Sequence, residues 1–386
     1  MSTPTVSFVI PCYKLGHLVA ECVNSILAQS YSHFEILIMD DCSPDNTSEV
    51  AKTITDSRVR YIRNEQNLGH LNNYNKGIKL SRGQYVWLIS ADDRLRVPYV
   101  LERYVNLLEQ HPEVGYVFCP GIGLQSSGET ELLETFYYGA KDTIFKGTEF
   151  IATVLRKGGG LLSPSVMVRK LCYEQLSMFP LDMPHQGDLY LWFLWALHYD
   201  VAYLAEPMVN YRSHDANMMK DFMTRSPKTI FVDESNVLWR IKREAERKGF
   251  HKLALFMEPF ISGKYAHGAG VILFNETCVP WGMTVEDCDE ALRSNSASTQ
   301  EYRRLRSKFF AYVGDKYWHR SKFQKAREYY RKALREDRKA LRIMAKLLAA
   351  YLGPLGAALR AAAKFIVRWV LAFAPREARQ LPVAGE

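Results

Sequence analysis

The chain has 386 residues, enough for one large domain with a smaller companion, and its 47% hydrophobic and 24% charged residues are typical of a globular protein. Its net charge of +8 fits nucleic acid, anionic lipid or phosphorylated small molecules as partners and does not choose among them. Its 7 cysteines are scattered and include no C-x-x-C pair, which argues against a disulfide framework and a zinc site, and for a reducing compartment.

The sequence lacks the pattern of a secretory signal and that of a membrane-spanning helix. Its first residues, MSTPTVSFVIPCYK, contain no basic segment followed by an apolar core. The longest apolar run, Leu347 to Leu359, is shorter than the roughly 18 to 20 residues that span a bilayer, and Lys346 and Arg360 flank it. We therefore expect a cytoplasmic protein.

Short apolar runs alternate with helical patterns along the first 120 residues. The patterns predict strands at 6–11, 35–39, 60–64, 85–90 and 115–120, and helices at about 16–29, 46–55, 70–80 and 98–110. Strands that are apolar along their whole length are buried on both faces. The alternation therefore predicts an α/β domain with a parallel sheet covered by helices on both sides.

Polar or turn-forming residues follow the first four predicted strands. They are Pro11 and Tyr13 after the first strand, Asp40 and Asp41 after the second, Asn64 and Asn67 after the third, and Asp92 and Asp93 after the fourth. The carboxyl ends of parallel strands meet at one edge of a sheet, and ligands of such sheets bind beyond that edge. We expect these residues to gather there.

The glycine motifs that cradle phosphate in other nucleotide-binding sheets are absent. Neither G-x-G-x-x-G nor G-x-x-x-x-G-K-[ST] follows the first strand. Carboxylates repel phosphate unless a divalent cation lies between them, and Mg²⁺ or Mn²⁺ prefers oxygen ligands. Asp93, with Asp92 beside it, therefore suggests a metal that bridges a diphosphate. The alternative is that each pair of aspartates only ends a strand and begins a turn.

The same residues fall within a series of longer motifs. In chain order the motifs are PCYK at 11–14, SILAQS at 25–30, FEILIMDDCSPDNT at 34–47, NLG at 67–69, NKGI at 75–78 and GQYVWLISADD at 83–93. This series resembles the family 2 glycosyltransferases. The resemblance implies a GT-A fold, a mostly parallel α/β sheet flanked by helices, over residues 1–220. Residues 1–120 would bind the nucleotide sugar, and residues 121–220 would supply the acceptor side and the catalytic base.

The resemblance also implies roles for individual residues. Tyr13 would lie against the nucleobase, Asp41 would hydrogen-bond the base, and Asp93 would ligate Mg²⁺ or Mn²⁺. The residues that would bind the nucleotide sugar are Pro11, Tyr13, Asp41, Asn67, Asp92, Arg212 and His214. Two alternatives remain open, in which Tyr13 is a core aromatic at a strand end and Asp41 is a helix or turn cap.

The family places its catalytic base in an E-D element at the start of a helix. Gly187 and Asp188 stand at those positions here, followed by Leu191 and Trp192, so the glutamate is replaced and the aspartate is kept. We assign Asp188 as the base that takes the proton of the attacking hydroxyl. The alternative is that Asp188 is only the N-cap of an apolar helix at 189–199.

The function implied by the resemblance is an inverting, metal-dependent glycosyltransferase of the hexosyltransferase type. Its donor would be a nucleotide-diphosphate sugar, with UDP favoured because a carboxylate suits the imide edge of uracil. Its acceptor would be a hydroxyl of a glycan or a lipid-linked molecule in cell-surface polysaccharide synthesis, and we expect no nucleic-acid partner. The alternative is a non-catalytic nucleotide-sugar-binding or scaffolding protein whose C-terminal helices bind partners.

The C-terminal region is predicted to be all-α. Residues 221–338 look helical and include one tetratricopeptide-like helix pair, in which Phe310, Gly314, Ala326 and Tyr330 have the spacing of that repeat. One repeat cannot bury its own apolar face, so we expect it to pack on the preceding helices.

Residues 339–386 are predicted to form basic amphipathic helices. The cations Arg342, Lys346, Arg360, Lys364 and Arg368 fall on one side of a helix, although Pro354 divides the stretch. We expect residues 339–373 to lie on an anionic bilayer, which would place the protein peripherally on the inner face of the membrane. The alternative is a helix pair that packs on the protein and leaves a solvated basic edge.

Overall fold

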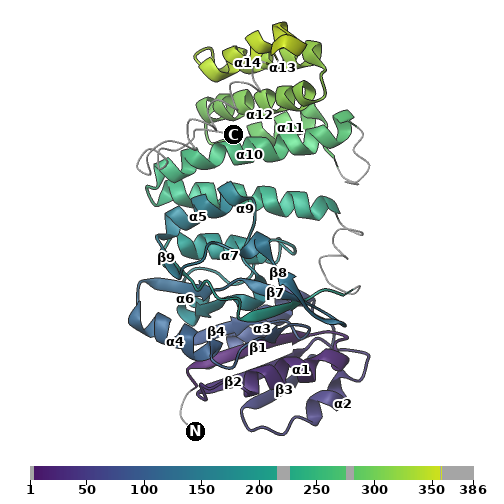
Figure 1. The fold of residues 1–386 in the computed structure, drawn as a ribbon, viewed down its shortest axis with the longest axis vertical. Coiled ribbons are helices and arrows are strands. Elements are labelled where there is room, and N and C mark those ends of the chain that lie inside the picture. The colour runs from purple at the N-terminus through teal and green to yellow at the C-terminus, as the bar shows by residue number, and fades with distance from the viewer. Residues whose placement is uncertain (1–3, 215–226, 275–281, 357, 359–386) are drawn as a thin grey trace. The chain divides into compact units, whose positions relative to one another are not determined.

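The computed structural model describes residues 4–214, 227–274, 282–356 and 358 (Figure 1). The chain forms two compact units that divide after Met257. The first unit is mixed α/β and the second is helical.

The core of the first unit is an eight-stranded sheet. In the order β3-β2-β1-β4-β10-β6-β11-β9, the strands are Val59–Arg63, Phe34–Asp40, Val6–Cys12, Tyr85–Leu88, Met167–Arg169, Val114–Phe118, Asp200–Tyr203 and Thr143–Phe145. The first four of these, β3, β2, β1 and β4, are parallel to one another. The predicted fold class, a mostly parallel sheet flanked by helices, is confirmed.

Three strands of the large sheet, β9, β10 and β11, lie beyond the five strands that the sequence pattern predicted. The fifth predicted strand, β6, does not pair with β4, because β10 lies between them and is antiparallel to both. A smaller sheet has the order β5-β12-β7-β8, with strands Arg94–Leu95, Val209–Arg212, Gly121–Gln125 and Gly128–Leu132. Through this small sheet, β12 lies next to β5, which begins directly after Asp93.

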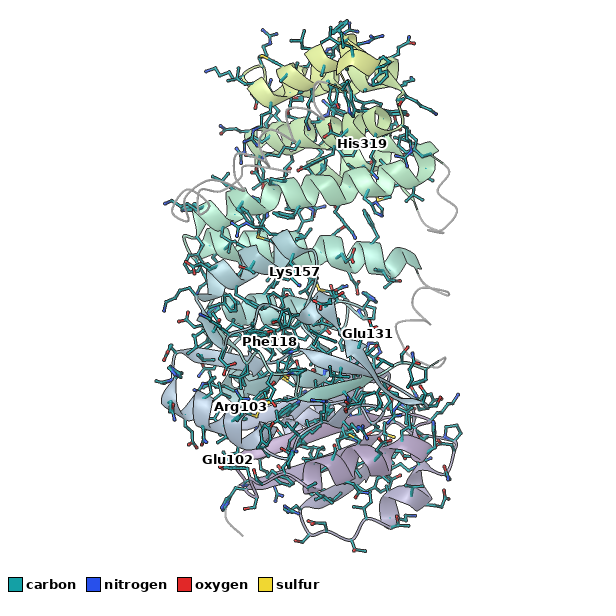
Figure 2. The ribbon with its side chains drawn as sticks, viewed as in Figure 1. Glu102, Arg103, Phe118, Glu131, Lys157 and His319 are labelled. Atoms are coloured by element: carbon teal, nitrogen blue, oxygen red, sulfur yellow. The ribbon has the colours of Figure 1, made fainter. Side chains whose placement is uncertain are left out.

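The predicted helices are present on both faces of the large sheet (Figure 1). One face packs against α1 (Gly16–Leu27), α2 (Thr47–Lys52) and α4 (Val100–Gln110), and the other against α3 (His70–Leu80), α5 (Gly147–Lys157) and α7 (Gly187–Ala196). Alternation along β2 divides its side chains between the two cores, since Ile36 and Ile38 join one and Leu37 and Met39 the other. Phe118, labelled in Figure 2, is fully buried.

The first unit also contains a helix that lies beyond the predicted end of the GT-A core at residue 220. Helix α9 (Pro227–Arg247) contributes Val237, Ile241 and Ala245 to the same core as α7. The unit runs on to Met257 within α10 (His251–Phe274). The first unit also contains a short helix, α6 (Lys170–Gln175), directly after β10.

The second unit contains α11 (Val285–Asn295), α12 (Thr299–His319), α13 (Phe323–Glu336) and α14 (Leu341–Tyr351). The predicted helix pair is formed by α12 and α13, where Gly314 allows close approach of the Tyr330 ring and Ala326 is buried. Its assignment as a tetratricopeptide-like repeat stays a prediction.

The predicted basic stretch at 339–373 is only partly within the described residues. Helix α14 belongs to it, whereas 359–373 lies outside the described ranges. Among the helices that are described, none is both long enough and apolar enough to cross a bilayer.

The close packing of α3 on the sheet predicts the effect of a substitution in the NKGI motif. A Cβ atom added at Gly77 would overlap Cγ1 of Val9 and lie 3.0 Å from Cγ of Met39. We expect Gly77→Ala to lower the free energy of unfolding by about 1–3 kcal/mol, because overpacking outweighs the higher helix propensity of alanine. Urea denaturation measures this change. Gly160→Ala is the control, since no atom lies within 4 Å of its added Cβ, and a Gly77→Ala protein as stable as this control contradicts the prediction.

Candidate active site

A pocket of about 230 Å³ brings together residues from both halves of the predicted catalytic domain. Pro11, Asp92 and Asp93 line it from the ends of the parallel strands, and Asp188 lines it from the start of α7. The remaining walls are His70, Leu71, Tyr74, Leu88, Ser90, Ser163, Pro164, Phe179, Pro184, His185, Gly187 and Tyr211. The predicted metal ligand and the predicted base therefore face one cavity.

The aspartate pair at the end of β4 concentrates negative charge where little water reaches. Asp93 is 4% exposed, and its backbone N–H donates to the carbonyl oxygen of Ser90 at 3.1 Å. Its carboxylate Oδ1 accepts a hydrogen bond from the backbone N–H of Arg212 at 2.9 Å. Burial, and then the charge of Asp92, raise the pKa of Asp93 well above its ordinary value.

The chemistry of this pair fits a divalent cation. Carboxylate oxygens are the ligands that Mg²⁺ and Mn²⁺ prefer, and a cation there would offset the burial cost that raises the pKa of Asp93. Within the described ranges, no group of three or more His, Cys, Asp or Glu side chains is arranged to hold a metal. Asp93 and Asp92 are the residues that would hold the cation, which substrate phosphates would also ligate.

Arg212 and His214 lie against the aspartate pair, and their predicted contact with the nucleotide sugar stays a prediction. His214 Nε2 is 2.9 Å from Oδ2 of Asp92. Arg212 donates from Nε to the carbonyl oxygen of Asp92 at 2.8 Å and from its guanidinium to Glu21 at 2.6 Å. Glu21 on α1 also accepts from Arg94 at 2.8 Å, so one carboxylate holds two arginines beside the site. Sequence reasoning missed Glu21, which belongs to none of the motifs.

Asp41 and Asn67 form a separate cluster that shapes the loop after β3. Asp41 is buried, and its carboxylate accepts from Nδ2 of Asn64 and the backbone N–H groups of Leu68 and Gly69, at 2.8, 2.8 and 3.0 Å. Asn67 donates from Nδ2 to the carbonyl oxygen of Asp41 at 3.2 Å. Asp41 thus holds a turn, as the alternative interpretation had it, and the nucleobase contact stays a prediction.

Tyr13 and Pro11 follow one another along the end of β1 but face different surroundings. Pro11 lines the pocket, whereas Tyr13 does not. The Tyr13 ring is 42% exposed, with Nζ of Lys14 5.0 Å from its centroid. The alternative that Tyr13 is a core aromatic is therefore wrong, and its ring is accessible to a planar ligand.

Asp188 lies in the first turn of α7 and is held in place by a hydroxyl group. Its Oδ2 accepts a hydrogen bond from Oγ of Ser163 at 2.8 Å, and its Oδ1 accepts one from the N–H of Leu189 at 2.7 Å. Burial raises the pKa of Asp188, although these hydrogen bonds oppose the shift. The helix begins at Gly187 with Gln186 as its cap, so Asp188 is not the N-cap that the alternative proposed.

The pocket contains two histidines that sequence reasoning did not select. His70 begins α3 directly after the NLG motif, and its Nε2 is 2.8 Å from the carbonyl oxygen of Pro184. Burial lowers the pKa of His70, which favours the neutral ring near pH 7. His185 comes from the loop before α7. In the sequence, only their positions could have pointed to them. His70 directly follows the glycine of the NLG motif, and His185 lies shortly before Asp188, the assigned base.

Residues 7–161 match the family model described as glycosyl transferase family 2. This segment of the chain is similar to the glycosyltransferases of that family. GlyG, a glycosyltransferase of Streptococcus pneumoniae, is 33% identical over 111 residues, which cover 28% of this chain and 37% of GlyG. An uncharacterized glycosyltransferase of Rickettsia typhi is 26% identical over 239 residues, which cover 61% of this chain and 71% of that protein. The chain thus covers little more than a third of the length of GlyG.

Solved structures show the same fold at low sequence identity. Residues 1–349 of TarS from S. aureus superpose on this chain with a TM-score of 0.55 at 14% identity, covering 90% of this chain and 92% of that one. TarS in complex with UDP-GlcNAc superposes with a TM-score of 0.54. The likeness supports the GT-A-type α/β domain followed by helices.

The hydrogen bond between Ser163 and Asp188 predicts a change in titration. The hydroxyl group of Ser163 stabilises the charged carboxylate of Asp188 and so counteracts the rise in pKa that burial causes. Ser163→Ala removes this hydroxyl group and should raise the pKa of Asp188 further. We expect the carboxyl of Asp188 to titrate above the ordinary aspartate range in the wild type, and at still higher pH in the variant. Carbon-13 NMR of labelled aspartate measures both, with Asp188→Asn for assignment. Ser177→Ala, outside the pocket lining, is the control. The same pKa of Asp188 in the wild type, Ser163→Ala and Ser177→Ala contradicts the prediction.

Proposed function

We propose that this protein is an inverting, metal-dependent glycosyltransferase that uses a nucleotide-diphosphate sugar. One observation carries the proposal: a single pocket has Asp92 and Asp93 on one wall and Asp188 on another. A transferase needs charge compensation for the leaving diphosphate and a base for the acceptor hydroxyl, and both must face the same reacting carbon. A protein that only binds a nucleotide sugar needs no base, so the placement of Asp188 favours the enzyme over the scaffolding alternative.

The donor we propose is a UDP-sugar. Tyr13 offers an exposed ring for the base, and Asp41 lies at the end of the neighbouring strand β2. Oδ2 of Asp41 accepts one hydrogen bond, from Gly69, among the described residues, which leaves a lone pair for the imide N–H of uracil. TarS, which has a similar fold, has been solved with UDP-GlcNAc and with UDP.

The transfer would proceed by direct displacement. The acceptor hydroxyl attacks the anomeric carbon and gives its proton to Asp188, while the bond from that carbon to the diphosphate oxygen breaks. Because Asp188 has a raised pKa, it is a stronger base than an ordinary carboxylate, and it accepts the proton only when it is ionised. When Mg²⁺ or Mn²⁺ is bound at Asp93 and Asp92, it supplies positive charge that stabilises the departing diphosphate. One displacement without an enzyme nucleophile inverts the anomeric configuration.

The acceptor we propose is a glycan or lipid-linked molecule of cell-surface polysaccharide synthesis. Aromatic and apolar side chains, including Tyr74 and Phe179, form the pocket walls around Asp188. Such walls suit the apolar face of a sugar ring, and Ser163 and His185 add polar groups that could orient its hydroxyls. The protein would act on the inner face of the membrane.

We also propose that the C-terminal region contacts an anionic bilayer. Leu341, Met344 and Leu348 of α14 lie at helical spacing and are 77%, 40% and 66% exposed. Lys339 and Arg342 are exposed beside them. An apolar stripe next to cations complements a membrane surface that is apolar below and negatively charged above.

The proposed reaction predicts the consequence of removing each carboxylate. Asp188→Asn removes the base, and we expect it to lower turnover by about 100- to 10,000-fold. Asp93→Asn removes a metal ligand, and we expect loss of Mn²⁺-stimulated turnover. The measurement is release of nucleotide diphosphate from a panel of nucleotide sugars that begins with UDP-GlcNAc. Glu131→Gln, at an exposed carboxylate of β8, is the control, and wild-type turnover by both aspartate variants refutes the site assignment.

The membrane proposal predicts binding that depends on both charge and the apolar stripe. We expect the full chain to float with vesicles of phosphatidylcholine and phosphatidylserine, and to stay unbound with phosphatidylcholine alone or at high salt. The double variant Leu341→Glu and Leu348→Glu should lose flotation, because carboxylates would then face the anionic surface. Leu255→Glu, at an exposed leucine of the first unit, is the control. Equal flotation of both variants contradicts the proposal.

A further inference from the structure

The loop that leads into α7 is held from two sides. On one side, His70 Nε2 contacts the carbonyl oxygen of Pro184 at 2.8 Å. On the other side, Asp233 of α9 accepts hydrogen bonds at Oδ2 from the backbone N–H groups of His185 at 2.7 Å and Gln186 at 3.2 Å. The next two residues are Gly187 and Asp188, so both contacts act directly before the assigned base.

Asp233 is placed to be a strong anchor for this loop. Its side chain is 1% exposed, and a buried carboxylate that accepts backbone N–H groups makes charge-assisted hydrogen bonds. Gln186, the cap residue of α7, makes no side-chain capping hydrogen bond of its own. Asp233, on the later helix α9, therefore supplies an anion near the N-terminus of α7, which is the positive end of that helix dipole.

We propose that Asp233 is a positioning residue, which fixes Asp188 and His185 in the pocket by binding the backbone of residues 185 and 186. This inference rests on the proposed function, because it gives Asp188 the role of base. Asp233 touches neither the pocket nor the aspartate pair at β4. It belongs to α9, which lies beyond residues 7–161 that match the family model.

The geometry separates base positioning from donor binding. Tyr13, Asp92 and Asp93 stand at the ends of β1 and β4, and none of the contacts of Asp233 reaches those strands. Proton transfer requires Asp188 to be within hydrogen-bond distance of the acceptor hydroxyl. A displacement of the loop by about 1 Å can cost about 100-fold in rate while the donor still binds.

The same helix supplies a matched control. Arg240 of α9 pairs with Asp182, earlier in the same loop region, but the two side chains are 41% and 61% exposed. Solvent screens such a pair, so it contributes little to the order of the loop. Arg240→Ala therefore removes a contact between α9 and this region without touching the backbone of residues 185 and 186.

The test compares Asp233→Ala, Asp233→Asn and Arg240→Ala in the full chain. For Asp233→Ala we expect kcat for donor turnover to fall about 10- to 100-fold, with the donor KM and the Kd for UDP within about twofold of wild type. Asp233→Asn keeps a neutral acceptor oxygen of the same shape and should recover part of kcat. Arg240→Ala should match the wild type. Circular dichroism and UDP binding show that each variant is folded.

Amide hydrogen exchange of residues 185–190 supplies a readout that needs no activity. Loss of protection there in Asp233→Ala, but not in Arg240→Ala, supports the positioning role. Unchanged protection and unchanged kcat in Asp233→Ala overturn the inference and leave the proposed function standing. A fall in UDP affinity together with kcat also overturns it, because Asp233 would then act on the whole fold. Absence of turnover in the wild type overturns the proposed function, and the exchange pattern still decides the positioning role.

Discussion

The burial of two adjacent carboxylates at the end of β4 is the constraint on which the rest of the site depends. A charge removed from water is costly unless another group compensates it, and Asp93 is almost completely buried. The protein provides a backbone N–H from Arg212 and a ring nitrogen of His214 beside Asp92. Burial and then the charge of Asp92 raise the pKa of Asp93, although the hydrogen bond from the Arg212 N–H opposes the shift.

The compensation comes from segments that are far apart in the chain. Arg212 stands 119 residues after Asp93, and the small sheet brings them together by pairing β12 with β5. Asp188 reaches the same pocket because β10 inserts between β4 and β6 and carries the Ser163 segment beside the aspartate pair. Residues 121–220 thus pair with strands of residues 1–120 through β10 and β11 in the large sheet and through β12 in the small one. Ser163, which precedes β10, donates a hydrogen bond to Asp188 at the start of α7.

The helices that follow the large sheet fall into two groups. Helix α9 packs in the core beside α7 and contacts the loop before Asp188, so it belongs to the first unit although the matching family model ends at residue 161. The later helices form a unit with its own buried residues, in which Glu258 accepts hydrogen bonds from Arg304 and Lys308. Among the described residues of this unit, Leu341 and Leu348 of α14 are largely exposed to solvent.

Local pattern in the sequence was sufficient for the parallel strands, their helices and the placement of Asp92 and Asp93, because apolar periodicity and strand ends are properties of neighbouring residues. The sequence by itself thus determined the fold class and the edge at which chemistry is expected. Only the tertiary structure decided that β10 separates β4 from β6, that Asp41 holds a turn, and that Glu21, Ser163, His70 and Asp233 support the site. These are contacts across 25 to 191 residues of chain. No local pattern encodes them, since each depends on which surfaces the packed core brings within hydrogen-bond distance.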